Sequence, residues 1–370
     1  MRDRILITGG AGFLGSHLAV RLVREGYRVR VLDNLTEQVH GRTGWPPYLP
    51  ESVERVHGDI RNFSQVREAL QGVDAVFHLA AAVGVGQSMY KINYYTDVNN
   101  RGTAILLESL TKQPVRKLVI ASSMSVYGEG CYRDRQGNVH CPAEREGDML
   151  RAGLWELYHD QEELDPMPTP ETKKPSPSSI YALSKFDQEC MGLIVGAAYA
   201  IPTTALRFFN IYGPHQSLSN PYTGVLAIFS SRFLNGRPPI IFEDGRQRRD
   251  FVSVHDVCEA CLLALESDKA AGEVFNIGSG SNYTVLEIAS KIADVLACPE
   301  LLPQITGEYR VGDIRHCFAD IGKARELLGY LPRVSLSDGL EELAQWLQNQ
   351  EAVDRVETMR QELASRGLSL

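Results

Sequence analysis

Two side chains that could carry proton chemistry, Tyr181 and Lys185, stand four residues apart at the start of a predicted helix. Residues i and i+4 share one face of a helix, so both side chains are expected to point to the same place. A neighbouring ammonium lowers the pKa of a phenol from its usual value of about 10, which would let Tyr181 act as a base near neutral pH. A predicted strand ends in Ser122 and Ser123, and a hydroxyl at the carboxyl end of a strand can meet this pair.

A glycine-rich turn lies between the first predicted strand and the first predicted helix. It contains Gly10-x-Gly12-x-x-Gly15 and the overlapping Gly9-x-x-Gly12-x-x-Gly15. Such glycines permit a tight turn and let a pyrophosphate rest on the helix N-terminus. Asp33 ends the second predicted strand, about 20 residues on, as a dinucleotide fingerprint requires. Its carboxylate can accept hydrogen bonds from a ribose 2′-hydroxyl and would repel a 2′-phosphate, so we expect NAD rather than NADP.

The elements that must position these motifs alternate between short apolar runs and helical stretches, which is typical of a parallel sheet with crossover helices. The expected strands are Ile5–Thr8, Arg28–Asp33, Glu54–His57, Ala75–Leu79, Lys117–Ser122 and Thr203–Phe209. Helical spacing of apolar residues predicts helices at Gly12–Glu25, Ser64–Leu70, Tyr95–Lys112 and Ser179–Ala198. The predicted fold class is therefore α/β, a Rossmann-type doubly wound parallel sheet with a smaller C-terminal substrate-binding lobe.

Two domains are expected: an NAD-binding domain over residues 1–213, and a mainly substrate-binding lobe over residues 214–370 with parts that return to the sheet. From Glu129 to Pro177 the chain is polar and proline-rich, which excludes helix and central strand and indicates an irregular insertion on the ligand side of the sheet. In the lobe, helices are expected at Phe251–Leu265, Thr284–Leu296 and Ser337–Gln348, and a strand at Val274–Ile277. The polar helical tail that follows carries no functional signal.

Composition limits the classes of partner. The 370 residues carry a formal net charge of −8, which disfavours nucleic-acid binding. No run approaches the roughly 18 apolar residues of a membrane span, and a strand begins too early for a signal peptide to precede it. We therefore expect a cytoplasmic protein that binds neither membrane nor nucleic acid.

The seven cysteines are expected to be reduced thiols. Cys131, His140, Cys141 and His159 all lie in the insertion, but their spacing fits no standard metal template, so no metal is predicted. Cys258 and Cys261 have Cys-x-x-Cys spacing within a helical stretch, where two small residues packed in a core are favoured over ligands.

Several motifs, in order along nearly the whole chain, resemble the extended short-chain dehydrogenase/reductases. The resemblance is narrower to the nucleotide-diphosphate-sugar epimerases and dehydratases, and it rests on the glycine turn, Ser122-Ser123-x-x-Val126-Tyr127-Gly128, the Tyr181/Lys185 pair and Arg207-Phe208-Phe209-Asn210-Ile211-Tyr212-Gly213-Pro214. It implies that Tyr181 is the catalytic base, that Lys185 holds the nicotinamide ribose and tunes Tyr181, and that Ser123 hydrogen-bonds the reacting sugar hydroxyl. The insertion is the main departure.

Further site residues follow from the predicted elements, as with Asp59 after the third predicted strand, and from the same resemblance. Asp59 is predicted to contact the adenine edge or, alternatively, to cap a helix, and Asn99 resembles a structural asparagine of the family. The full set expected around the cofactor is Gly9, Gly12, Phe13, Leu14, Gly15, Asp33, Asn34, Asp59, Ile60, Leu79, Ala80, Ala81, Asn99, Tyr181, Lys185 and Phe208. The set expected around the substrate is Val85, Gln87, Ser88, Ser123, Ser125, Asn210, Arg249 and Arg315, with the two arginines on phosphates.

The residues after Ser123 bear on the reaction. Dehydratases of this family carry Asp-Glu there and decarboxylases a glutamate at the second position, whereas this chain has Met124 and Ser125. His215 resembles one half of the pair that 3,5-epimerases need, but a cysteine at Ser125 is missing. What remains is 4-epimerisation through a transient 4-keto sugar.

The loop Ala80–Tyr90 is expected to face the sugar. It has no cation before Lys91, and Val83, Val85 and Met89 suit a methyl group. Its sequence resembles epimerases that act on dTDP-L-rhamnose, with UDP-hexose 4-epimerases, other nucleotide-sugar epimerases or reductases, and a non-catalytic NAD sensor as alternatives. The resemblance also implies a homodimer, because family members pair the helices at Tyr95–Lys112 and Ser179–Ala198 into a four-helix bundle.

Overall fold

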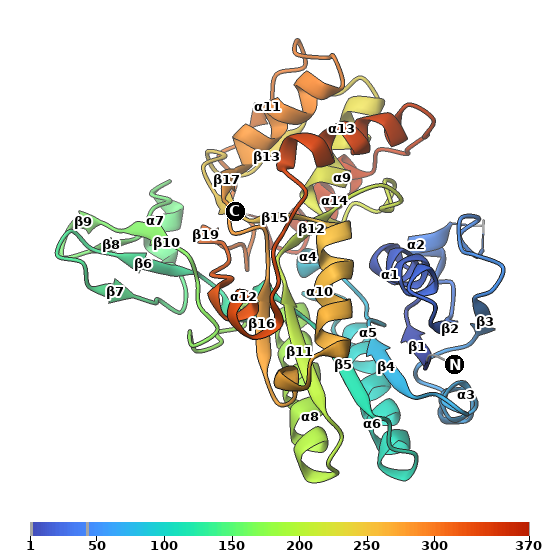
Figure 1. Cartoon of the computed structure of the whole chain (residues 1–370). Coiled ribbons are helices and arrows are strands. Elements are labelled where there is room, and N and C mark those ends of the chain that lie inside the picture. The colour runs from blue at the N-terminus through green and yellow to red at the C-terminus, as the bar shows by residue number, and fades with distance from the viewer. Residues whose placement is uncertain (1–2, 42–43, 370) are drawn as a thin grey trace.

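The computed structural model describes residues 3–41 and 44–369, and its centre is a seven-stranded sheet (Figure 1). The strand order is β16-β11-β5-β4-β1-β2-β3, and every neighbouring pair is parallel. The bounds are β1 (Arg4–Thr8), β2 (Arg28–Asp33), β3 (Glu54–His57), β4 (Ala75–His78), β5 (Lys117–Ser123), β11 (Thr203–Phe208) and β16 (Val274–Ile277). The chain runs outward from β1 on one side and from β4 on the other, which confirms the predicted doubly wound sheet.

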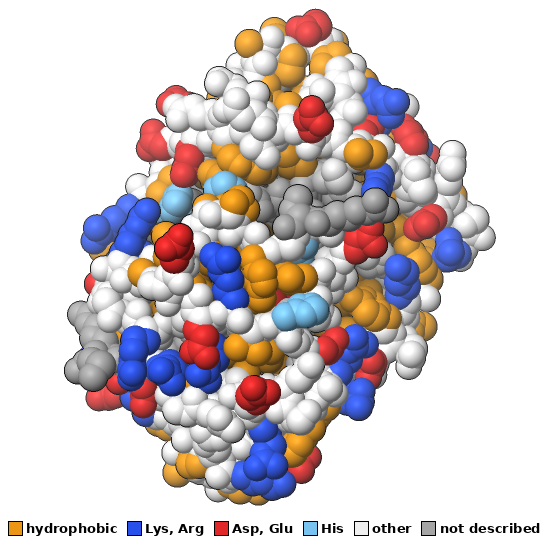
Figure 2. All heavy atoms as spheres, turned by 90° about the vertical axis from the view of Figure 1, so that its right-hand side faces the viewer, with side chains coloured by type: hydrophobic (Ala, Val, Ile, Leu, Met, Phe, Trp, Pro, Cys, Tyr) orange, Lys and Arg blue, Asp and Glu red, His pale blue; other side chains and the backbone are white. Residues whose placement is uncertain are grey.

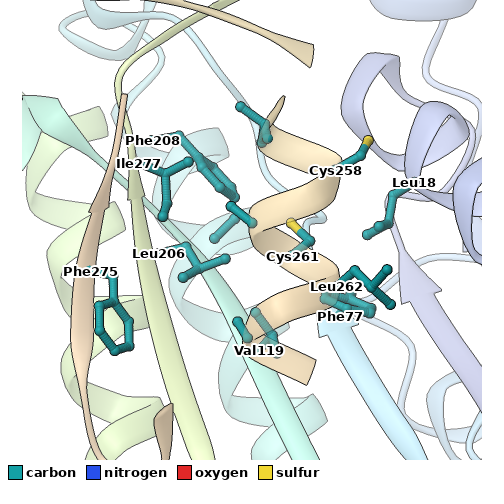
Figure 3. Close-up of a cluster of buried hydrophobic side chains, with 14 of the residues drawn as sticks. Leu18, Phe77, Val119, Leu206, Phe208, Cys258, Cys261, Leu262, Phe275 and Ile277 are labelled. Atoms are coloured by element: carbon teal, nitrogen blue, oxygen red, sulfur yellow. The ribbon is translucent and has the colours of Figure 1, made fainter. Parts of the chain in front are cut away.

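Helices cover both faces of the sheet. On one face lie α1 (Phe13–Arg24) and α10 (Val254–Glu266), which contact each other, and on the other lie α3 (Phe63–Ala69), α6 (Gly102–Lys112) and α8 (Ile180–Ala198). Cys258, Cys261 and Leu262 of α10 pack among Leu18 of α1, Phe77 of β4 and further residues of the sheet (Figure 3). Both cysteines are at most 2% exposed, so they are core residues, as expected. The shorter helix α2 (Glu37–His40) follows β2 in the chain, and α12 (Gly322–Leu328) packs on β16.

Two predicted helices are broken. The stretch expected as Tyr95–Lys112 consists of α5 (Ile92–Tyr95), a π-helical turn over Thr96–Arg101, and α6. The stretch expected from Phe251 begins as strand β15 (Phe251–Ser253), which pairs with β12 (Asn210–Tyr212), and α10 starts only after the Ser253 side chain caps it.

The insertion is more regular than expected. Strands β6 (Cys131–Arg133), β7 (Val139–His140) and β10 (Asp165–Met167) form an antiparallel sheet. Between β7 and β10 the chain forms α7 (Gly147–Arg151) and the hairpin of β8 (Tyr158–His159) and β9 (Glu162–Glu163). Pro166 fits because β10 is an edge strand. The expectation of seven reduced thiols is wrong in this structure for one pair, because Cys131 and Cys141 form a disulfide. The β6–β7 pairing brings their Cα atoms within 4.5 Å, inside disulfide range.

The second lobe packs α9 (Val225–Leu234), α11 (Val285–Val295) and α13 (Leu336–Leu347) around a separate apolar core. Its short strands are β13 (Ile240–Ile241), β14 (Arg248–Arg249), β17 (Tyr283–Thr284), β18 (Gln304–Ile305) and β19 (His316–Cys317), and the last helix is α14 (Val356–Ala364). Strand β16 and helix α10 return to the main sheet. On the face shown in Figure 2, acidic and basic side chains are interspersed around an apolar centre. Among the described residues, no helix is long and apolar enough to cross a membrane.

Candidate active site

A cavity of about 800 Å³ runs from the glycine turn after β1, past the carboxyl ends of β4 and β5, to the second lobe and α14. It lies at the point where the strand order reverses between β1 and β4, the usual ligand position in open α/β sheets. Its lining contains most of the predicted site residues.

The glycine turn is shaped to leave room for a ligand's phosphates. Gly9 has φ +71°, and a Cβ there would lie 2.8 Å from the Ala80 backbone; a Cβ at Gly15 would collide with the Gly9 carbonyl oxygen. No side chain caps the start of α1, so its first N–H groups are free toward the cavity. A bare helix N-terminus with a tight glycine turn fits a pyrophosphate. Gly9, Gly12, Phe13, Leu14 and Gly15 all line the cavity.

Asp33 closes the ribose end of this region. Its Oδ2 accepts from the backbone N–H of Ala11 at 3.0 Å, and its Oδ1 accepts from that of Leu35 at 2.9 Å. The carboxylate is thereby fixed beside the cavity, where it would repel a 2′-phosphate. Asn34 donates to Asp59 at 3.0 Å, and hydrogen bonds from Arg61 hold the pKa of Asp59 well below its usual range. The other predicted cofactor residues that line the cavity are Asn34, Asp59, Ile60, Leu79, Ala80, Ala81 and Phe208.

Asn99 does not line the cavity, contrary to its place in the predicted cofactor set. It is fully buried, accepts from the Ala82 N–H at 2.7 Å and donates to the Ala82 carbonyl and to Ser184 Oγ. The π-helical turn directs its amide to these partners. Asn99 therefore ties the loop after β4 to α8, which supports the structural interpretation only.

Tyr181 and Ser123 meet in the middle of the cavity. Ser179 caps α8, and the N–H of Tyr181 donates to Ser88 Oγ at 3.0 Å, so the first turn of α8 is held from two sides. Burial raises the pKa of Tyr181, whereas a hydrogen bond with Ser123 lowers it. Ser125 donates to Ser123 Oγ at 2.9 Å, which fixes the serine hydroxyl. Burial therefore opposes ionisation of the phenol, and the Ser123 hydroxyl favours it.

Lys185 is held by a chain of buried polar groups. Burial lowers its pKa to about 7, and its Nζ donates to Gln188 Oε1 at 2.6 Å. Gln188 Nε2 donates to Thr103 Oγ1 at 2.7 Å, and Thr103 donates to the carbonyl oxygen of Asn99 at 2.6 Å. His78 Nε2 lies 2.8 Å from the same Thr103 oxygen, and burial lowers the pKa of His78 to about 3, so the ring is neutral.

This order of donors fixes the orientation of the Gln188 amide. Thr103 Oγ1 already donates its proton to Asn99, so it can only accept from Gln188 and from His78. The amide oxygen of Gln188 must then face Lys185. Gln188 was not among the predicted site residues, because contacts between β4, α6 and α8 create the chain.

Of the predicted substrate residues, Val85, Ser123, Ser125, Asn210 and Arg249 line the cavity. Gln87 and Ser88 do not. Gln87 is 5% exposed and accepts from Tyr95 and Gln38, whereas Ser88 supports Tyr181 from behind. Both point from α4 (Val85–Ser88) into the protein, because one side of this short helix packs on α5 and α8. Their predicted contact with the sugar is therefore wrong.

The predicted contact of Arg315 with a substrate phosphate is also wrong. Arg315 is 0% exposed and absent from the cavity lining, and its guanidinium bonds Glu243 at 2.9 Å, Asp244 at 2.6 Å, and Glu156. These carboxylates already occupy its donors, so none is left for a phosphate. The arginine of this segment that lines the cavity is Arg310, paired with Asp313 at 2.8 Å.

Arg249 is held over the cavity by backbone carbonyl groups. Its guanidinium donates to the carbonyl oxygens of Arg315, at 2.9 Å, and of Ile314. The backbone N–H of Arg315 in turn donates to Glu129 Oε1 at 2.8 Å, and Glu129 pairs with Arg145 at 3.1 Å. The insertion thus supports the segment around Arg315, whose carbonyl groups hold the Arg249 guanidinium.

Other cavity residues carried no signal in the sequence. Tyr48 stacks on His215, with ring centroids 3.8 Å apart, and its hydroxyl lies 2.7 Å from Ser16 Oγ. His215 also contacts His17 and Trp346, so it belongs to an aromatic cluster over α1. Tyr222, Gln247 and residues of α14 complete the far end. Their positions depend on the packing of the lobe.

A doubly wound sheet with a glycine turn, a carboxylate after β2 and a Ser–Tyr–Lys group at one cavity defines a dinucleotide-dependent enzyme. The model of the NAD dependent epimerase/dehydratase family matches residues 5–278. A dTDP-L-rhamnose 4-epimerase of Burkholderia thailandensis is 35% identical over 349 residues, which cover 93% of this chain and 94% of that protein.

Two solved structures are similar over nearly their whole length. The UDP-glucose 4-epimerase of Thermotoga maritima with UDP-glucose has a TM-score of 0.75 at 31% identity, covering 93% of this chain and 98% of that one. The UDP-glucose 4-epimerase of Thermus thermophilus with NAD has a TM-score of 0.75 at 30% identity, covering 94% and 99%. The chain belongs to the NAD-dependent epimerase/dehydratase family. The predictions of an enzyme, an isomerase, and of NAD as cofactor are confirmed.

Proposed function

We propose that the chain is a nucleotide-diphosphate-sugar 4-epimerase that acts on a dTDP-6-deoxyhexose such as dTDP-L-rhamnose. The observation that carries the reaction type is the surroundings of Tyr181. Ser123 and Lys185 support a single base, and Met124 and Ser125 stand where an additional acid or base would be needed. A 4-epimerisation needs no further proton-transfer group, because the transient ketone only has to turn over.

Each residue of the site has a separate role in the proposed 4-epimerisation. Tyr181 takes the proton of the sugar C4 hydroxyl, and Ser123, fixed by Ser125, aligns that hydroxyl. When bound, NAD supplies a reversible hydride acceptor at C4. Lys185 stabilises the phenolate form of Tyr181. Once the ketone has turned over, the hydride taken from C4 goes back to the opposite face of that carbon, and Tyr181 returns the proton to the C4 oxygen. Asn210, Arg249 and Arg310 line the part of the cavity that is left for the diphosphate.

The 6-deoxy sugar is supported by the apolar loop after β4. Val83, Val85 and Met89 line the cavity, and no lysine or arginine of this loop does. A methyl group suits such a wall better than a carboxylate, which would be buried without a cation. The 35% identical relative named dTDP-L-rhamnose 4-epimerase points the same way. A UDP-hexose 4-epimerase is the second candidate, favoured by the two solved structures.

The surroundings of His215 disfavour 3,5-epimerisation. Burial lowers its pKa, and its ring is packed on Tyr48 rather than free to shuttle a proton.

The test is turnover of a panel of dTDP-, UDP- and GDP-sugars, including dTDP-L-rhamnose, followed by NMR. We expect deuterium placed at C4 to remain in the product and no solvent deuterium at C3 or C5. Tyr181→Phe should lower kcat about 10²–10⁴-fold with little change in KM, because only the base is removed. Solvent exchange at C3 or C5 would contradict the proposal, and an inert, NAD-bound protein with every sugar would favour the sensor alternative.

We also propose a homodimer through α6 and α8. Apolar side chains of α8 remain exposed, with Leu183 46% and Ile194 67% accessible. Light scattering at micromolar concentration should give twice the chain mass of 41.1 kDa. A monomer at that concentration would contradict this arrangement.

A further inference from the structure

The last helix, α14, forms one wall of the cavity. Val356, Met359 and Leu363 occupy positions i, i+3 and i+7, so they lie on one helical face, and each is at most 4% exposed. All three line the cavity, as does Leu368 beyond the helix. The same face packs on Ile240 of the lobe. The polar residues of α14 lie on its other sides.

Polar contacts on several elements fix this wall. Asp354, just before α14, accepts from Arg232 at 2.9 Å, and both side chains are buried. Glu362 accepts from the hydroxyls of Tyr90 and Tyr222, each at 2.7 Å. The N–H of Val311 donates to the Leu368 carbonyl oxygen at 3.0 Å. A segment held at this many points presents its apolar face in one position.

The wall stands close to the reacting centre. A Cβ at Gly86 of α4 would lie 3.4 Å from Leu363, so the two segments are in contact. The same helix α4 carries Ser88, whose hydroxyl accepts from the backbone N–H of Tyr181 at 3.0 Å. Val85, Gly86, Tyr181 and Leu363 line the same cavity, so a sugar whose C4 hydroxyl reaches Tyr181 and whose ring lies along α4 meets Leu363 at the Gly86 contact.

The chemistry of the wall is uniformly apolar. The two ionised groups nearest to it on α14 are engaged elsewhere: Glu362 by the two tyrosines, and Arg360 by Glu308 at 2.7 Å. A hydroxyl or carboxylate facing Met359 and Leu363 would lose its water without gaining a partner, whereas a methyl group would gain contact.

We propose that Leu363 and Met359 of α14 are specificity-determining residues that select a methyl group, rather than a hydroxymethyl or carboxylate group, at C5 of the sugar. This inference rests on the proposed 4-epimerase function and adds the element that sets its preference. It assigns a substrate-contacting role to a helix whose sequence alone carried no functional signal.

The experiment compares dTDP-L-rhamnose with dTDP-L-mannose, which differ only by the C6 hydroxyl. We expect wild-type enzyme to prefer the 6-deoxy sugar by about 10- to 100-fold in kcat/KM. Leu363→Gln keeps the side chain's bulk but adds an amide, and it should reduce this ratio at least tenfold. Gln361→Leu, on the exposed side of the same helix, is the matched control and should leave the ratio unchanged.

An unchanged ratio in a folded Leu363→Gln variant would overturn the inference, as would a wild-type enzyme that turns over both sugars equally. The second result is measured on wild-type enzyme, so the inference can be tested even if the Leu363→Gln protein does not fold. Calorimetric binding of the two sugars to wild-type enzyme separates the inference from the proposed function. Tighter binding of the 6-deoxy sugar without any epimerisation would refute the proposed 4-epimerase function but support the role of Leu363 and Met359. Epimerisation of both sugars without preference would support the function and refute that role.

Discussion

Replacing Gln188 by methionine tests how the protein keeps Lys185 charged. The Lys185 ammonium is fully buried, and Gln188 Oε1, at 2.6 Å, is the acceptor that the hydrogen-bond chain orients toward it. The charged or titratable groups around it are Tyr181, the neutral His78, and Glu189, which Arg207 engages at 2.6 Å. Methionine fills the same space but offers no comparable acceptor.

The size and sign of the effect follow from this geometry. A hydrogen bond to a charged group contributes about 1.5–3 kcal/mol, and one pKa unit corresponds to about 1.4 kcal/mol. Loss of the acceptor should lower the pKa of Lys185 by about one to two units from its value of about 7. Since only the ammonium can stabilise the Tyr181 phenolate, activity is lost as pH rises through this pKa. The basic limb of the pH profile should therefore move to lower pH.

The assay is kcat/KM against pH for wild type and for Gln188→Met, with the melting temperature recorded for both. Gln188→Glu is the control, because its carboxylate restores an acceptor and should move the limb back or beyond its wild-type position. A basic limb that stays in place in Gln188→Met, with only the melting temperature lowered, would refute the reasoning and leave Gln188 a packing residue.

Three further predictions concern the cofactor, the arginines and stability. Asp33→Ser should reduce the preference for NAD over NADP at least about tenfold, measured by titration of cofactor fluorescence, because the repulsion of the 2′-phosphate is removed. Arg310→Ala should weaken binding of a nucleotide sugar by about 10- to 100-fold in calorimetry, whereas Arg315→Met should instead lower the free energy of unfolding by about 3–5 kcal/mol, since it strands buried carboxylates. Below pH 6.5, the unfolded state protonates His78 while the folded state, with a pKa of about 3, does not. Urea unfolding should therefore show a free energy of unfolding that decreases as the pH is lowered below 6.5. His78→Asn should make this pH dependence less steep.

The sequence predicted best what is encoded locally. The glycine turn, Asp33 and the Tyr181/Lys185 pair sit within or beside single elements, so their spacing alone places them at the ends of strands and helices. Arg315 shows the limit. It stands five residues after Arg310, and only long-range contacts with Glu156 and Glu243 decide that Arg315 turns into the protein while Arg310 lines the cavity.

The same reasoning explains α14 and Gln188. The apolar positions of α14 cannot be told from those of any helix that packs on a core, because the cavity they border is made by other segments. Gln188 gains its role from Thr103, which is 85 residues away in the chain. No pattern of spacing contains such a contact.

The buried charges that join the insertion to the lobe have a consequence for protein engineering. Glu129 and Glu156 come from the insertion, whereas Glu243 and Arg315 come from the lobe, and Arg145 of the insertion also reaches Glu243 at 2.7 Å. A chimera that exchanges only the insertion with that of a relative would leave ions of one parent facing an unmatched partner in the other. Grafts should therefore transfer residues 129–177 together with the matching lobe residues, and natural variation at these positions is expected to change in pairs.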